Sequence, residues 1–273
     1  MTLQGRHILV TGAGGALGSA VALACAAQGA NLILLGRRQQ PLEVLYDRIA
    51  AAGYALPHLF PCDLSKLDED QAQTLALAIT QQFGGLHGVV HCAADTGALG
   101  PIADITGKDW HRLLHLNLTA PFLLTRPLLP MLASQDDAGI VFIDDPASHG
   151  KAYWGAYGVA KAGLVQLAQT LAEEWTAGER LRVATLAPAP FRSSLRQRIF
   201  PGEKPANLPG PEPIAAFICR WLSPPGRSLT ARCFGPADFD APEIPQEPAA
   251  AGLSSQQPIS SPAAVSGTSA PNP

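Results

Sequence analysis

Short apolar runs recur along the first 235 residues of the chain, and longer alanine- and leucine-rich stretches separate them. Short apolar runs bounded by turn residues are typical of buried strands, whereas the longer stretches have the periodicity of helices. Their alternation predicts an α/β fold: a doubly wound, Rossmann-type parallel sheet of about seven strands, with helices on both faces. The predicted strands are HILVTG, NLILLG, PHLFP, LHGVVH, GIVFID, LRVATLAP and ARCFG, and the predicted helices cover about residues 16–29, 40–52, 67–83, 109–133, 155–178 and 211–223.

The composition changes near residue 236. From there to Pro273 the chain is rich in Pro, Ala, Ser and Gln and has no periodic apolar pattern, which is typical of disorder. We therefore expect one domain over residues 1–235 and a disordered tail over residues 236–273. The proline cluster at residues 201–213 is either a mobile loop over the carboxyl edge of the sheet, where such folds bind ligands, or a surface loop without a role.

Bulk composition narrows the class of protein. The chain has 273 residues, is 47% hydrophobic and carries a net charge of −3, which suits a large core and argues against nucleic acid or an anionic membrane as a partner. It has five scattered cysteines, mostly in apolar runs. An odd, scattered set indicates buried, reduced thiols in a cytoplasmic protein, and we expect neither a signal peptide nor a membrane-spanning run.

A glycine-rich turn follows the first predicted strand and opens the first predicted helix. Glycines let the backbone approach a pyrophosphate, and the helix N-terminus offers free N–H groups and a positive dipole end. A strand–turn–helix context makes such a cluster specific for a dinucleotide. The predicted phosphate-binding residues are Gly12, Gly14, Gly15, Ala16, Leu17 and Gly18.

Two arginines stand where dinucleotide folds select their cofactor. An acid after the second strand would bind the ribose hydroxyls of NAD, but this chain has Arg37 and Arg38. Guanidinium groups suit a 2′-phosphate, so NADP(H) is favoured over NAD(H). Asp63 follows the third strand and could accept a hydrogen bond from the adenine, cap the helix that begins near residue 67, or do both. Its neighbour Leu64 is expected beside the cofactor.

Tyr157 and Lys161 are four residues apart, which places them on one face of a helix. A nearby ammonium group lowers the pKa of a phenol by stabilising the phenolate. Such a tyrosine can give a proton to a carbonyl oxygen, or take one from an alcohol, while a nicotinamide exchanges a hydride.

The motifs TGAGGALG, LLGRR, CDLS, HLNLTAPFLLT and WGAYGVAK make the chain resemble the short-chain dehydrogenase/reductase family over about residues 4–235. The sequences of the last two motifs are most similar to a bacterial YciK-like branch. The resemblance implies a seven-stranded Rossmann sheet, nicotinamide-dependent carbonyl reduction or alcohol oxidation, and homodimers or homotetramers. It also implies the roles of single residues: Tyr157 as acid/base, Lys161 on the nicotinamide ribose, Asn117 holding a relay water, and Ala93 and Pro188 beside the cofactor.

The chain departs from the family pattern at four places. Ala16 replaces the middle glycine of the turn, His91–Ala94 replaces Asn-Asn-Ala-Gly, and Ala189 replaces the glycine after Pro188, with Ser193 near a family threonine. The largest departure is Asp144, which stands where the family serine would orient the substrate oxygen.

Three interpretations of Asp144 remain open. As a carboxylate it disfavours the phenolate of Tyr157 and offers no proton. As a neutral acid in a dry pocket, beside Asp145, it could donate a hydrogen bond. In a shifted loop Ser148 would take the place of the serine, which is the least favoured interpretation; the pair Asp145–Pro146 by itself reads as a turn after the strand. His111, His115 and His149 read as surface or helix histidines and not as metal ligands.

Two functions follow from these residues. One is an NADPH-dependent reductase or dehydrogenase that acts on a small carbonyl or alcohol. The other is a non-catalytic dinucleotide-binding protein, a sensor or assembly partner. Retention of Asn117, Tyr157 and Lys161 favours the enzyme. Association is expected through the helices over residues 109–133 and 155–178, which are apolar around much of their circumference.

Overall fold

The computed structural model describes residues 2–175, 181–224, 226 and 233–239. Within them, seven strands form one parallel sheet in the order β3-β2-β1-β4-β5-β6-β7. The predicted Rossmann-type fold is therefore confirmed. The strands are β1 His7–Thr11, β2 Asn31–Gly36, β3 His58–Pro61, β4 Gly88–His91, β5 Ala138–Ile143, β6 Leu181–Leu186 and β7 Cys233–Phe234.

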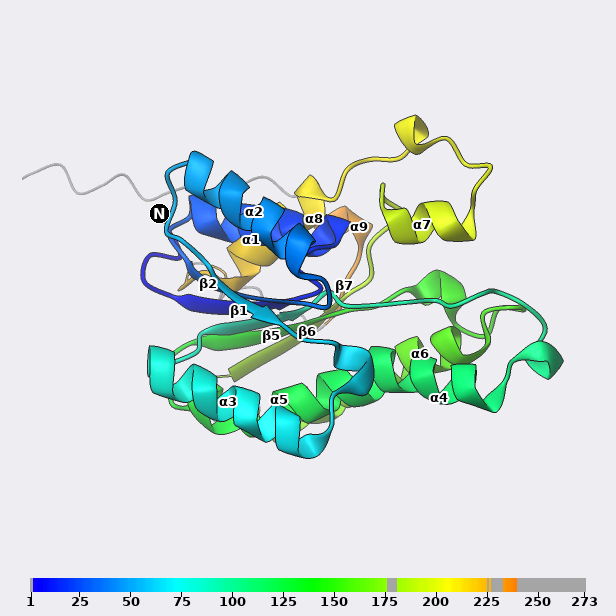
Figure 1. The fold of residues 1–273 in the computed structure, drawn as a ribbon, viewed down its shortest axis with the longest axis horizontal. Coiled ribbons are helices and arrows are strands. Elements are labelled where there is room, and N and C mark those ends of the chain that lie inside the picture. Colours follow the sequence, from blue (N-terminus) through cyan, green and yellow to red (C-terminus); the bar gives the residue numbers. More distant parts are fainter. Residues whose placement is uncertain (1, 176–180, 225, 227–232, 240–273) are drawn as a thin grey trace, which may run out of the picture. The chain divides into compact units, whose positions relative to one another are not determined.

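Helices cover both faces of this sheet, with α1, α2 and α8 on one side and α3, α5 and α6 on the other (Figure 1). Each face has its own apolar core, because the central strands bury residues on both sides. The helices are α1 Ala16–Ala27, α2 Gln39–Ala51, α3 Glu69–Phe83, α4 Gly107–Leu114, α5 Ala120–Ala133, α6 Gly155–Glu174, α7 Ser194–Ile199, α8 Glu212–Leu222 and α9 Pro236–Phe239. Short helical turns are η1 Leu64–Lys66, η2 Ile102–Asp104, the π-helix η3 His115–Thr119, η4 Pro146–Ser148 and η6 Pro205–Asn207.

Two predicted helices differ from the structure. The helix expected over residues 109–133 is interrupted by the wider turn of η3, which separates α4 from α5. The helix expected from residue 67 begins at Glu69 instead, where Asp68 and Gln71 form a reciprocal capping box. The preceding turn η1 has its own cap, Asp63, whose carboxylate accepts the N–H of Ser65 at 3.1 Å. Asp63 therefore caps η1 and not the longer helix that was expected.

The C-terminal part of the domain extends past the predicted boundary at residue 235. Most of the predicted tail, residues 240–273, lies outside the described residues, but Pro236–Phe239 forms α9, and the ring of Phe239 lies 5.2 Å from that of Phe217 on α8.

The thiols of Cys25 and Cys219 are buried as expected, whereas Cys233 is exposed because β7 is a short edge strand. In the part of the chain that the structure describes, no helix has the length and apolar character needed to cross a bilayer.

Candidate active site

The carboxyl ends of four neighbouring strands meet at one end of the sheet. β1 leads into Gly12, β4 into Cys92, β5 into Asp144 and β6 into Ala187, and all four of these residues line one cavity of about 470 Å³. A second cleft of about 230 Å³ shares Gly12, Gly15 and Cys92 with it. Ligands of open α/β sheets bind at this edge.

The glycine turn forms the floor shared by both hollows. Gly12 has a φ of +61°, and a Cβ there would lie 2.7 Å from the backbone of Ala93, so a larger residue does not fit. Gly15 precedes the first residue of α1 without any side-chain cap. The N–H groups at the start of α1 are therefore available to an anion.

All but one of the sequence-predicted site residues line the two hollows. The larger cavity is lined by Gly12, Gly15, Ala16, Leu17, Gly18, Asp144, Tyr157, Lys161 and Pro188. The smaller cleft is lined by Gly12, Gly14, Gly15, Arg37, Arg38, Asp63, Leu64 and Ala93. This arrangement fits a dinucleotide: a side-chain-free turn for the pyrophosphate, two exposed arginines at one end and the Tyr157–Lys161 pair at the other.

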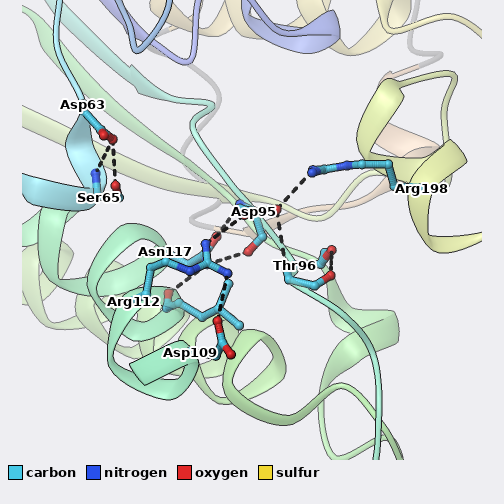
Figure 2. Close-up of polar contacts among 10 residues, drawn as sticks. Asp63, Ser65, Asp95, Thr96, Asp109, Arg112, Asn117 and Arg198 are labelled. Atoms are coloured by element: carbon cyan, nitrogen blue, oxygen red, sulfur yellow. Dashed lines mark hydrogen bonds and ion pairs between the residues drawn. The ribbon is translucent and has the colours of Figure 1, made fainter. Parts of the chain in front are cut away.

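The carboxylate of Asp63 lies at the arginine end of the smaller cleft. Desolvation alone would raise its pKa, but hydrogen bonds from Ser65 and the charges of Arg37 and Lys66 lower the pKa below its ordinary value. Asp63 is therefore an acceptor that stays ionised at neutral pH, and its bonds to Ser65 hold it in place (Figure 2).

Asn117 is the exception, because it lies behind the wall of the cleft. Its side chain is 1% exposed and lies in η3. Its amide Nδ2 donates to the backbone oxygens of Asp95 and Leu113, both at 2.8 Å, and its Oδ1 accepts the N–H of Asp95 at 3.2 Å. π-Turns often mark functional positions, and here the wider turn lets one buried amide fix the loop after β4 (Figure 2).

Asp95, which the sequence reasoning did not single out, joins three elements. Its carboxylate pairs with Arg112 on α4 at 2.9 Å and with Arg198 on α7 at 3.1 Å (Figure 2). Desolvation opposes these charges, yet the pKa of Asp95 is lowered overall. Its position shortly after β4, on a loop at the carboxyl edge of the sheet, was the signal that could have identified it.

The segment His91–Ala94 differs from the family pattern but is well packed. The imidazole of His91 stacks on Phe142 at 4.8 Å and contacts the hydroxyl of Thr125 at 2.9 Å. Burial, with a contribution from the charge of Lys161, lowers the pKa of His91 to about 3. The backbone N–H of Ala93 donates to the Thr11 hydroxyl at 3.3 Å, so Thr11 ties β1 to the end of β4.

Tyr157 and Lys161 both project from α6 and are buried. The ammonium of Lys161 donates to the backbone oxygen of Ile143 at 2.7 Å and lies 5.6 Å from the centre of the Tyr157 ring. Burial lowers the pKa of Lys161, and the charges of Asp144 and Asp145 oppose that shift. Both side chains line the larger cavity.

The carboxylate that reaches Tyr157 is that of Asp145, not Asp144. The Tyr157 hydroxyl donates to Oδ2 of Asp145 at 3.2 Å. Desolvation raises the pKa of the Tyr157 phenol well above its ordinary value, and the charges of Asp145 and Asp144 raise it further.

Asp144 also lines the cavity, 7% exposed, but its Oδ1 contacts Nε2 of His149 at 2.9 Å. His149 is therefore a half-buried partner of a cavity residue, although it does not itself line either hollow. Ser148 does not take the place of the family serine, because its hydroxyl donates to the backbone oxygen of Asp145 at 2.7 Å within η4.

A sequence model described as short chain dehydrogenase matches residues 6–204. The chain belongs to the short-chain dehydrogenase family. Among its relatives, the uncharacterized oxidoreductase YciK of Escherichia coli K12 is 32% identical over 245 residues, which is 89% of this chain and 96% of the relative. This similarity places the chain in the YciK-like branch of the family.

Two solved short chain dehydrogenases share this architecture. One, from Shigella flexneri 2a strain 301 and complexed with NADP, is 32% identical with a TM-score of 0.81, over 86% of this chain and 98% of that one. The other, from Escherichia coli CFT073 and complexed with NADPH, is 32% identical with a TM-score of 0.81, over 86% and 97%.

Proposed function

We propose that this short-chain dehydrogenase transfers a hydride between NADP(H) and a small carbonyl or alcohol substrate, with Tyr157 as the acid/base. The observation that carries the proposal is the shared cavity: Tyr157 and Lys161 line the same hollow as the glycine turn. A nicotinamide whose pyrophosphate binds at that turn can therefore reach Tyr157.

The preference for NADP(H) rests on the smaller cleft. Arg37 and Arg38 are exposed there, and both can donate charge-assisted hydrogen bonds to a 2′-phosphate. The two relatives complexed with NADP and NADPH support the same choice. We place the protein in the cytoplasm, as its odd and scattered cysteines indicate.

The roles of the side chains follow from their positions. When bound, the reduced cofactor supplies a hydride to the substrate carbon. Tyr157 would give its proton to the substrate oxygen, and Lys161 would bind the nicotinamide ribose and favour the phenolate. Asn117 would act through the loop that it fixes, since both N–H groups of its amide donate to backbone oxygens.

Tyr157→Phe tests the acid/base role. With a panel of ketones and aldehydes, we expect kcat to fall by about 10²–10⁴, while the dissociation constant of NADPH stays nearly unchanged. A carbonyl substrate that is turned over equally fast by Tyr157→Phe would contradict the proposal.

A second candidate is a dinucleotide-binding protein without turnover, and Asp145 favours it. A tyrosine that donates to a carboxylate, with a raised pKa, is a weak acid toward a ketone oxygen. Saturable NADPH binding without turnover of any carbonyl or imine would select this candidate.

A further inference from the structure

The reacting end of the cavity carries acidic charge. The carboxylate of Asp145 is within 3.2 Å of the Tyr157 hydroxyl, where the substrate heteroatom would bind. Asp144, the neighbouring residue, lines the same cavity. This end of the cavity therefore has two carboxylates and one ammonium group, that of Lys161.

Each cationic group around the cavity has a polar partner other than Asp145, and among the described residues no lysine, arginine or histidine forms an ion pair with Asp145. The engaged pairs are Lys161 with the backbone oxygen of Ile143 (2.7 Å), Arg196 with Glu203 (2.6 Å), Arg198 with Asp95 (3.1 Å) and His149 with Asp144 (2.9 Å).

This charge opposes carbonyl reduction. Hydride addition to a ketone places negative charge on the oxygen, and a carboxylate beside it repels that charge. The Tyr157 hydroxyl, whose proton should neutralise this oxygen, donates to Asp145 instead. Burial together with both acids also raises the pKa of Tyr157, which makes it a weaker acid. Asp145 would instead stabilise a substrate that is positively charged at the reacting atom.

An aromatic wall lies beside Tyr157, whose hydroxyl donates to the same carboxylate. Trp154 is 7% exposed and lines the cavity, and its ring centroid is 5.8 Å from that of Tyr157 and 6.4 Å from that of Phe200. Aromatic faces attract cations within about 6 Å. A carboxylate and an aromatic wall at one spot are the usual components of a site for an organic cation.

We propose that the preferred electrophile of this enzyme is an imine taken up as its protonated form, an iminium cation, and that the product is an amine. This inference rests on the proposed function for the cofactor and for the place of hydride transfer. It differs from the proposed function only in the substrate, which is an imine instead of a carbonyl compound.

The reaction balances without a proton from Tyr157. A C–H bond forms at the iminium carbon as a C–H bond of the reduced nicotinamide breaks, and the π electrons of C=N become the nitrogen lone pair. The substrate is reduced, the nicotinamide is oxidised, and the proton that made the imine cationic stays on nitrogen. Relative to the free neutral imine, the transition state retains positive charge, so the carboxylate of Asp145 lowers the barrier.

The test compares 3,4-dihydroisoquinoline with 1-tetralone, a neutral ketone on a similar bicyclic ring, at neutral pH with NADPH. We expect kcat/KM for the imine to exceed that for the ketone by about tenfold or more. Asp145→Asn keeps the shape but removes the charge, so this ratio should fall by about tenfold or more. Asp47→Asn, an exposed acid on α2, makes the same change in net charge away from the cavity and should leave the ratio unchanged.

A binding measurement extends the test to an enzyme that turns over neither compound. With NADP present, protonated 1,2,3,4-tetrahydroisoquinoline should bind about tenfold or more tightly than 1-tetralol, and Asp145→Asn should remove the difference. Equal or better use of the ketone, or no preference for the cation in binding, would overturn the inference while leaving the proposed function intact. Loss of all NADPH binding would instead refute the proposed function, and the inference with it.

Discussion

At the scale of single residues, the pKa of Tyr157 is subject to two opposite influences. The ammonium of Lys161 favours the phenolate, whereas burial and the carboxylate of Asp145 disfavour it. The second influence dominates, because the pKa of Tyr157 is raised. We therefore expect the choice of substrate at this site to depend on the charge of Asp145.

The two arginines of the smaller cleft carry the choice of cofactor. In the double variant Arg37→Ser, Arg38→Ser we expect the dissociation constant of NADPH to rise by about 10–100-fold, because charge-assisted hydrogen bonds to the 2′-phosphate are lost. The dissociation constant of NADH should change by less than about threefold. Fluorescence titration of both cofactors measures this, and equal losses for NADPH and NADH would contradict the role of the arginines.

His91 predicts how stability depends on pH. Its pKa in the folded protein is lowered to about 3, so between that value and the ordinary value near 6.5 only the unfolded chain binds the proton. The free energy of unfolding therefore decreases as the pH falls below about 6.5. His91 contributes at most about 1.4 kcal/mol per pH unit to this decrease.

Urea unfolding of His91→Asn at pH values between neutral and mildly acidic checks this. The variant should lose less stability on acidification than the wild type. His87, whose pKa is lowered to about 4 by burial, keeps part of the dependence in both proteins. An identical loss in the two proteins would contradict the assignment to His91.

At the scale of elements, the strands were predictable and the direction of single side chains was not. Periodicity located all seven strands, but it gave no sign of the wider turn at His115–Thr119, which depends on the fit between Asn117 and the loop around Asp95. The match to the family serine selected Asp144. Consecutive residues of extended chain point to opposite sides, so that match could not decide which of two adjacent acids faces the tyrosine.

The start of α3 gives a prediction at this scale. Asp68 accepts the N–H of Gln71 at 2.7 Å, and the Gln71 side chain accepts the N–H of Asp68 at 3.2 Å. Asp68→Ala should lower the free energy of unfolding by about 1 kcal/mol. Denaturant melts measure the loss, and Asp70→Ala, a neighbouring exposed acid without a cap bond, should cost clearly less. An equal cost for both would contradict the capping role.

At the scale of the whole molecule, the alternation of apolar runs predicts the domain fold. It does not predict the oligomeric state. Phe122 on α5 is 41% exposed and Val159 on α6 is 49% exposed. We predict a homodimer or homotetramer that covers these helices, and we expect Phe122→Glu, Val159→Glu to shift it toward monomer in sedimentation velocity. Val44→Glu, on α2 and 54% exposed, is the matched control. A strictly monomeric wild type would contradict this prediction.

The central claim is that the cavity beside the glycine turn is an NADP(H) site. Because Trp154 lines that cavity, titration of NADPH should quench tryptophan emission in a saturable way, and Trp154→Phe should lose most of the quenching while it still binds the cofactor. NADH should require clearly higher concentrations. Emission that falls only in proportion to added NADPH, without saturation, in the wild type would contradict the account.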